Sequence, residues 1–307
     1  MTGAADARHK GMDPEAFNLV AREHMNEAVT VGGHQPFREY HPSAWRHFVR
    51  RIALLDRLST LQFDSVLDVG CAEGFFTDAI GTHFGVDAWG VDLADQAVLI
   101  ASRRYGRPVA SAQATQLPFA DGAFDLVYST EVIEHVLNPD AMLAEMRRVA
   151  RRHVLVTTPV SQTEHDHEPD YEIAHQGHIN NFDENAVRRL FGPDADLRTF
   201  RCNATFALLT GFGRFLPSPA RDWFYALNQR VAKSFGSPHG RFVPLRNRDW
   251  LIVTSAAPGE AGPREWRCPI CHRELLMQDD AWTCEADALR FPLIADGIPD
   301  FVAGRPA

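Results

Sequence analysis

The sequence predicts an α/β protein whose core is a doubly wound parallel sheet, and three observations support this prediction. Strand-like apolar segments alternate with segments of helical periodicity from Ser65 to Thr158, which is typical of a parallel sheet with helices on both faces. The first strand runs directly into a glycine-bounded turn, Gly70 to Gly74. The second strand ends in Asp92, at the edge where open α/β sheets bind ligands.

The predicted elements follow one another through short connections. Apolar residues recur at helical spacing up to Leu58, and we expect this first helix to pack on the core, with a lid role as the alternative. Asn138 is expected to cap a helix that starts at Pro139, and Asp183 a helix that ends at Phe191. The expected strands are 65–70, 88–92, 108–114, 124–129, 153–158, 197–208 and 250–254, and the other expected helices are 74–83 and 94–103.

Composition limits the class of protein. The chain has 307 residues, enough for one large core and a smaller domain, and its net charge of −9 argues against a nucleic-acid partner. Residues 1–12 lack an apolar signal region, and no apolar run approaches the roughly 20 residues that span a bilayer. We therefore expect a cytoplasmic protein, in which the five cysteines are thiols or metal ligands rather than disulfides.

The turn after the first strand carries the main chemical signal. A dinucleotide site requires G-x-G-x-x-G, and the spacing in Val66–Gly74 does not match it. Asp68 instead places a carboxylate beside the turn, which suits a positively charged ligand such as S-adenosylmethionine. Asp92 can accept hydrogen bonds from both ribose hydroxyls, and the amide of Gln113 can read the adenine edge.

Two motifs extend this argument to a family. Val-Leu-Asp-Val-Gly-Cys begins at Val66, and Leu-Pro-Phe-x-x-x-x-Phe-Asp-Leu-Val begins at Leu117. Across residues 60–256 the chain resembles the class I S-adenosylmethionine-dependent methyltransferases, of the type-11-like kind. The resemblance implies a seven-stranded Rossmann-like sheet with an antiparallel last strand, and transfer of the sulfonium methyl group. It implies these cofactor-binding residues: Asp68, Gly70, Cys71, Gly74, Asp92, Leu93, Gln113, Ala114 and Glu131.

The chain departs from the family pattern at two positions. Ala72 stands where the middle glycine of the turn is usual, which narrows the turn. Gln113 replaces the usual Asp, so the adenine contact would be made by a neutral amide. We expect neither change to abolish cofactor binding.

A second constellation follows the fourth strand. If the chain is helical there, Glu131, Glu134 and His135 share one face and suit Mg²⁺ or a similar divalent ion. The pattern resembles Glu-x-x-Glu-His of ubiquinone-pathway O-methyltransferases and of metal-dependent ribose 2′-O-methyltransferases of small RNAs. In the latter a downstream histidine completes the site, and His178 is the candidate. The alternative has no metal: Glu131 contacts the cofactor, and His135 or His178, with Glu134, is catalytic.

The C-terminal segment carries a further cysteine pattern. Cys268, Cys271, Cys284 and Asp287 form two knuckles that could hold Zn²⁺ tetrahedrally. Residues 265–303 resemble the small ribbon-like activator subunit of tRNA and translation-factor methyltransferases. The resemblance implies an accessory domain fused in cis. Some members of that family have Asp at the fourth ligand position, and this variant needs no metal.

These observations predict three parts: a helical extension (1–58), a methyltransferase domain (59–256) with a lid or substrate insertion (210–248), and a zinc-ribbon-like domain (265–303). The first functional prediction is a biosynthetic O-methyltransferase acting on a sugar, glycoconjugate or phenolic hydroxyl. The acidic charge, the Glu-x-x-Glu-His pattern and the aromatic insertion favour it, as does the absence of Asn/Asp-Pro-Pro-Tyr/Phe after the fourth strand. The alternatives are methylation of RNA or a translation factor, and a non-catalytic cofactor-binding scaffold. Nothing in the sequence indicates an oligomeric state.

Overall fold

The computed structural model describes most of the chain between residues 53 and 306, together with a few N-terminal helical residues. The described residues are 18, 21–23, 26, 53–160, 179–180, 182–202, 248–257 and 259–306. The predicted insertion (210–248) and His178 therefore lie almost wholly outside the described part. In the part that is described, no helix combines the length and apolar character needed to cross a bilayer.

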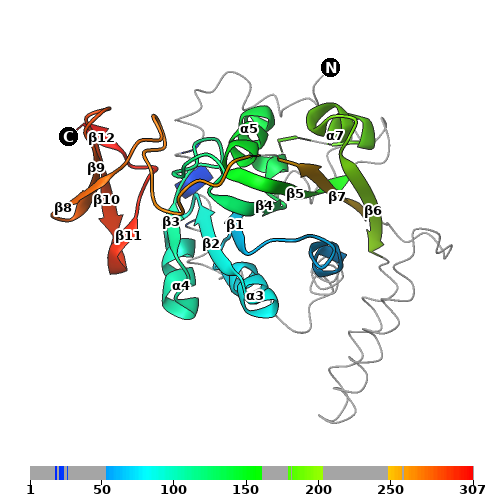
Figure 1. The fold of residues 1–307 in the computed structure, drawn as a ribbon, viewed down its shortest axis with the longest axis horizontal. Coiled ribbons are helices and arrows are strands. Elements are labelled where there is room, and N and C mark those ends of the chain that lie inside the picture. Colours follow the sequence, from blue (N-terminus) through cyan, green and yellow to red (C-terminus); the bar gives the residue numbers. More distant parts are fainter. Residues whose placement is uncertain are drawn as a thin grey trace, which may run out of the picture.

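A seven-stranded sheet forms the centre of the molecule, with strand order β3-β2-β1-β4-β5-β7-β6 (Figure 1). β7 runs antiparallel to both of its neighbours, and the other pairs are parallel, so the predicted sheet with an antiparallel last strand is confirmed. The strands are β1 (Ser65–Val69), β2 (Asp87–Asp92), β3 (Val109–Ser111), β4 (Phe124–Thr130), β5 (Ala150–Val160), β6 (Asp196–Cys202) and β7 (Arg248–Ala256). The helices that connect them are α3 (Phe75–Phe84), α4 (Asp95–Tyr105), α5 (Pro139–Val149) and α7 (Glu184–Phe191).

Local sequence signals explain where these elements begin. The Asn138 side chain accepts a hydrogen bond from the Ala141 backbone N–H at 3.0 Å, and Asp183 caps α7 in the same way through Ala186. Every residue of β1 is buried, as expected for a central strand covered on both faces. The third predicted strand is shorter than expected, because its last residues turn into the loop that carries Gln113.

The core lies in two layers, one on each face of the sheet. Leu54 and Leu58, in the helical turn before β1, are buried in one layer against Ile80 and Tyr128. The prediction that this segment packs on the core is therefore confirmed for residues 53–58, while its earlier apolar positions lie outside the described residues. The other layer is built around Leu67, Phe124 and the apolar face of α5.

A second, smaller sheet lies beyond the β3 edge (Figure 1). The backbone N–H of Phe301 donates to the carbonyl of Ser111 at 2.8 Å, and Ser111 pairs with Asp300 in a parallel bridge. Trp266 packs between the two sheets, with ring centroids 5.0 Å from Trp89 and 5.1 Å from Phe119. The strands of the small sheet are β8 (Leu276–Gln278), β9 (Ala281–Cys284), β10 (Leu289–Ile294), β11 (Ile298–Pro299) and β12 (Arg305–Pro306).

Candidate active site

The turn between β1 and α3 depends on two glycines for different close contacts. Gly70 has φ of 85°, and a Cβ atom there would lie 2.2 Å from Cγ2 of Val132. Gly74 has φ of 74°, and a Cβ atom there would lie 2.6 Å from Cβ of Ala101 in α4. Left-handed backbone and close packing both exclude a side chain at these positions. The turn therefore packs tightly against the loop after β4 at Gly70 and against α4 at Gly74.

Ala72 occupies a strained position in the middle of this turn. Its φ of 46° lies in the left-handed region, which costs about 1–2 kcal/mol for a residue with a Cβ atom. Its backbone N–H donates to Oδ2 of Asp92 at 2.8 Å. Oδ1 of the same carboxylate accepts from the backbone N–H of Ala94 at 2.9 Å. Asp92 thus joins the turn after β1 to the start of α4 across the carboxyl edge of the sheet.

Asp68 lies beneath the turn rather than on its surface. Its side chain accepts a hydrogen bond from the Thr77 hydroxyl at 2.7 Å, and the residue is only 2% exposed. Burial raises the pKa of Asp68 from 3.8 to about 7, and the nearby Asp92 carboxylate acts in the same direction. A cation held close to the turn would favour the ionised form of this carboxylate. The neighbouring Cys71 is also buried, which raises the pKa of its thiol well above the usual value.

N-terminal residues contact the far end of the same edge. Asn18 donates to Oε1 of Gln113 at 2.7 Å, so it orients the amide that is predicted to meet adenine. Arg22, one helical turn later, pairs with Asp300 at 2.7 Å and with Asp95 at 3.4 Å. Neither residue was predicted from the sequence, although Asn18, Arg22 and Asn26 recur at the four-residue spacing of one helix face.

The remaining predicted cofactor-binding residues line the loops after β2 and β3. The carbonyl of Leu93 accepts a hydrogen bond from the Ser111 hydroxyl at 3.3 Å, which ties the end of β2 to β3. Ala114 is partly buried against the core beside Gln113. All of these residues therefore lie along one edge of the sheet, where the carboxyl ends of β1, β2 and β3 meet.

The expected helix from Glu131 to His135 is wrong. Glu131 has φ of 58°, and only a single 3-10 turn, η1 (Ile133–His135), follows it. The backbone N–H of Glu131 donates to the Thr157 carbonyl of β5 at 3.1 Å, which holds the residue at the end of the sheet instead of in a helix. The three predicted divalent-ion ligands consequently do not share one helical face.

Glu134 and His135 occupy different environments. Glu134 is 1% exposed, its side chain accepts from the Thr158 hydroxyl at 3.4 Å, and its carbonyl accepts from Ile179 and Asn180. His135 is only half-buried. In the described part of the chain, Glu131, Glu134 and His135 do not bring three ligand atoms together, and His178 lies outside that part. The divalent-ion site therefore stays a prediction.

The four predicted zinc ligands do converge. The ligand atoms of Cys268, Cys271, Cys284 and Asp287 all lie within 4.8 Å of one another. Sγ of Cys271 is 3.5 Å from Sγ of Cys284, and Oδ2 of Asp287 is 3.1 Å from Sγ of Cys268. Zn–S bonds of about 2.3 Å in a tetrahedron place ligands about 3.7 Å apart, which is close to the separations of 3.1–3.5 Å seen here.

Comparison with known proteins shows what the central part of the chain is similar to. The family described as "Methyltransferase domain" matches residues 67–156. O-methyltransferase cnsE of Penicillium expansum is 33% identical over 102 residues, which cover 31% of this chain and 37% of that protein. The ubiquinone biosynthesis O-methyltransferase of Methylococcus capsulatus is 33% identical over 107 residues, which cover 33% of this chain and 45% of that protein. The chain thus aligns with less than half the length of these relatives.

A solved structure shares the same fold. Phosphoethanolamine N-methyltransferase 2 of Haemonchus contortus, in complex with phosphomonomethylethanolamine and S-adenosylhomocysteine, superposes with a TM-score of 0.52 at 17% identity. The superposition covers 81% of this chain and 61% of that one. Residues 67–156 therefore match a methyltransferase domain in sequence, and the chain shares the fold of this solved methyltransferase.

The buried Asp68 generates a pH-dependent prediction. A raised pKa means that ionising Asp68 destabilises the ligand-free protein as pH rises from about 4 to about 7. S-adenosylmethionine, which is a cation, should offset that cost, so its affinity should rise about tenfold between pH 6 and pH 8. The measurement is calorimetric titration at both pH values, for the wild type and for Asp68→Asn.

The Asp68→Asn protein should lose most of this pH dependence, whereas Asp78→Asn, at a half-buried acid of α3 that pairs with Arg107, should keep it. S-adenosylhomocysteine lacks the sulfonium charge and should show a weaker pH dependence. Equal pH dependence of cofactor affinity in all three proteins would show that Asp68 does not act on the ligand.

Proposed function

We propose that the chain is an S-adenosylmethionine-dependent methyltransferase that methylates a hydroxyl group of a small molecule. One observation carries the proposal: the Gly70–Gly74 turn and the Asp92 carboxylate are hydrogen-bonded to each other at the carboxyl edge of the sheet. That arrangement places two acids and a tight glycine turn where a cationic adenosine ligand would lie. The names of the two relatives above support oxygen as the acceptor atom.

Each proposed contact uses a group of suitable chemistry. Both oxygens of Asp92 accept a backbone N–H, and a carboxylate is the acceptor that ribose hydroxyls require. Oε1 of Gln113 is engaged by Asn18, which leaves the amide nitrogen to donate to adenine. The cofactor supplies an electrophilic methyl group, and the protein's task is to hold an acceptor oxygen in line with it.

The acceptor side of the proposal rests on the loop after β4. His135 is half-buried and carries an imidazole suited to removing a hydroxyl proton near neutral pH. Glu134 is buried, and its proposed role is to position His178. The backbone carbonyl of Glu134 accepts a hydrogen bond from the N–H of Ile179, the residue that follows His178. His178 is the second candidate base, and a divalent ion bound by these residues would lower the pKa of the acceptor hydroxyl.

Methylation of RNA or of a translation factor is the alternative, and it rests on the C-terminal sheet. That sheet docks beside the cofactor edge through Ser111 and through the Arg22–Asp300 ion pair. An accessory domain in this place could position a large substrate. The aromatic insertion, whose basic face would support this alternative, lies outside the described residues.

A methyl-transfer assay separates these acceptors. The protein is incubated with cofactor that carries a labelled methyl group and with separate small-molecule, RNA and protein fractions. We expect label in the small-molecule fraction, and His135→Ala should reduce its rate by about 10²–10⁴-fold if the imidazole is the base. Label only in RNA or protein would overturn the proposed substrate class, and no transfer to any fraction would favour the scaffold alternative.

We also propose that Cys268, Cys271, Cys284 and Asp287 bind one zinc ion that stabilises the small sheet. Zinc binding would deprotonate the thiols, whose pKa values burial raises for Cys268 and Cys271 in the metal-free protein. Metal analysis of the purified protein should find one zinc per chain, and chelation should lower the melting temperature.

The matched variants are Cys271→Ser and His272→Ala, because His272 is adjacent to the cluster but contributes no ligand atom. Cys271→Ser should lose the zinc and the response to chelator, whereas His272→Ala should retain both. Zinc content near zero in wild-type protein produced with added zinc would contradict the proposal.

A further inference from the structure

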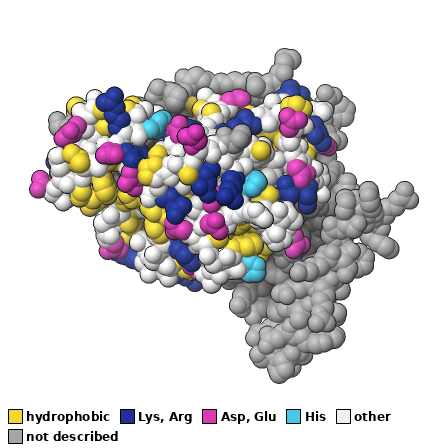
Figure 2. All heavy atoms as spheres, in the orientation of Figure 1, with side chains coloured by type: hydrophobic (Ala, Val, Ile, Leu, Met, Phe, Trp, Pro, Cys, Tyr) yellow, Lys and Arg dark blue, Asp and Glu magenta, His cyan; other side chains and the backbone are white. Residues whose placement is uncertain are grey.

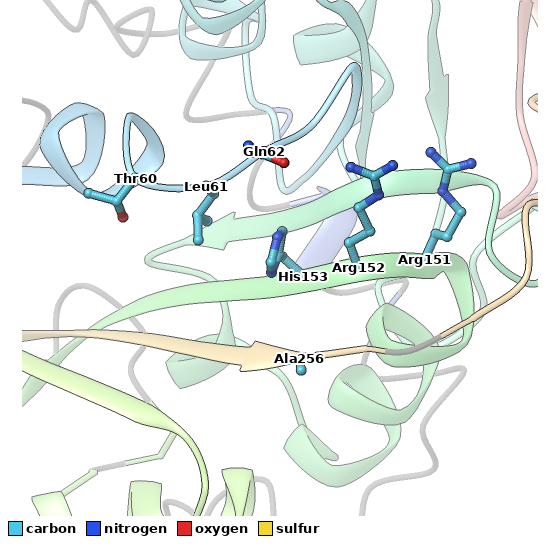
Figure 3. A pocket seen from close by; sticks show the side chains of 7 residues that line it. All are labelled: Thr60, Leu61, Gln62, Arg151, Arg152, His153 and Ala256. Carbon is cyan, nitrogen blue, oxygen red and sulfur yellow. The ribbon is translucent and has the colours of Figure 1, made fainter.

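A pocket opens at the amino-terminal edge of the sheet, opposite the edge that carries the candidate active site (Figure 3). It is lined by residues 60–62, which precede β1, by residues 151–153 at the start of β5, and by Ala256 at the end of β7. Its volume of about 480 Å³ is ample for one phosphate group with part of the molecule that bears it. Nothing in the proposed methyl transfer uses this pocket.

Two arginines of this pocket share one buried carboxylate. Arg151 donates to Oδ1 of Asp125 at 2.7 Å, and Arg152 lies 3.2 Å from the same oxygen. Oδ2 of Asp125 is occupied by the backbone N–H of Asp64 and by the Ser65 hydroxyl. Figure 3 shows the two guanidinium groups side by side. One carboxylate therefore faces two positive charges, and the cluster carries a net positive charge.

On the β7 side of the pocket, two further arginines also share one carboxylate. Arg57 pairs with Asp196 at 2.9 Å, and Arg198 pairs with the same carboxylate oxygen at 3.2 Å. Arg57 also donates to the hydroxyl of Thr60, which lines the pocket. These four arginines thus share two carboxylates, those of Asp125 and Asp196. Basic side chains also gather in the middle of the face drawn in Figure 2, although the whole chain has a net charge of −9.

His153 lies between these two clusters, and their charges shift the pKa of its imidazole. Burial lowers the pKa of His153, and the charges of Arg152 and Arg57 lower it further, while Asp125 raises it. The imidazole is therefore neutral at neutral pH in the ligand-free protein. A bound anion would oppose the arginine charges and raise the pKa of His153.

We propose that this pocket binds a phosphate-type oxyanion, held by the guanidinium of Arg152 together with Arg151 and His153. In the described part of the chain, the two terminal nitrogens of Arg152 donate to no protein oxygen, so they can bind two oxygens of one phosphate in a fork. The pocket volume of about 480 Å³ suits free phosphate or a small phosphorylated molecule rather than a nucleic-acid strand.

The direct test is a titration with inorganic phosphate at constant ionic strength, followed by NMR of the His153 imidazole. We expect saturable shifts and an increase in the pKa of His153 on binding. Arg152→Gln should weaken phosphate binding by about tenfold or more, because it removes a charge-assisted fork, and Arg152→Lys should restore part of the affinity. Both variants leave Arg151 paired with Asp125, so the fold is preserved.

Arg264→Gln is the matched control. Arg264 has the same side-chain exposure as Arg152, 44%, and pairs with Asp87 outside the pocket lining. Phosphate affinity should be unchanged in this variant. The proposal is overturned if phosphate causes no saturable shift of His153, or if Arg264→Gln weakens binding as much as Arg152→Gln does.

Two further titrations identify the ligand and test the role of His153. Ribose 5-phosphate that binds at least tenfold more tightly than inorganic phosphate would indicate a phosphorylated small molecule, and equal affinities would indicate the free ion. Sulfate keeps its charge between pH 5 and pH 8, so it isolates the titration of His153. Its affinity should rise as pH falls and His153 becomes protonated in the wild type, and it should stay constant in His153→Gln. A flat profile in the wild type would remove His153 from the proposed site.

Discussion

The carboxylate of Asp92 is the interaction on which the candidate active site depends. One oxygen holds Ala72 in a left-handed conformation, and the other holds Ala94 at the start of α4. The bond to Ala72 helps to offset the backbone strain at that residue. The same carboxylate is the group proposed to bind the ribose. Structure and ligand recognition therefore rest on one side chain, which is only 6% exposed.

The two edges of the sheet have opposite electrostatic character. At the carboxyl edge, burial raises the pKa of Asp68 and the nearby Asp92 carboxylate adds to the rise, so that edge favours a cation. At the amino edge, paired arginines outnumber the carboxylates that they share, and that edge favours an anion. The small C-terminal sheet extends the β3 side of the cofactor edge. Arg22 links that sheet to α4 by its two ion pairs.

Features specified by local sequence could be predicted. The cap at Asn138, the glycine turn and the alternation of strands and helices each depend on residues a few positions apart, and the structure agrees with them. The seven-stranded order with its antiparallel strand came from the family resemblance. The zinc ligands could be proposed because each pair is close in sequence, and folding only has to bring two pairs together.

Features set by long-range contacts could not be predicted. The helical interpretation of Glu131–His135 failed because a hydrogen bond to Thr157, on a different strand, holds Glu131 in a left-handed turn. The contacts of Asn18 with Gln113 and of Arg22 with Asp300 join residues 95 and 278 positions apart. The shared carboxylates at the amino edge likewise combine side chains from separate strands, and nothing in the local pattern distinguishes them from exposed arginines.

Calorimetric titration of S-adenosylmethionine into the wild type and Asp92→Asn tests the central claim most directly. Asp87→Asn, at the opposite end of β2, is the matched control. We predict that Asp92→Asn weakens binding by about 1–3 kcal/mol, because charge-assisted hydrogen bonds to the ribose are lost and the turn is loosened. Asp87→Asn should bind as the wild type does. Equal affinity in Asp92→Asn and the wild type would contradict the assignment of this edge as the cofactor site.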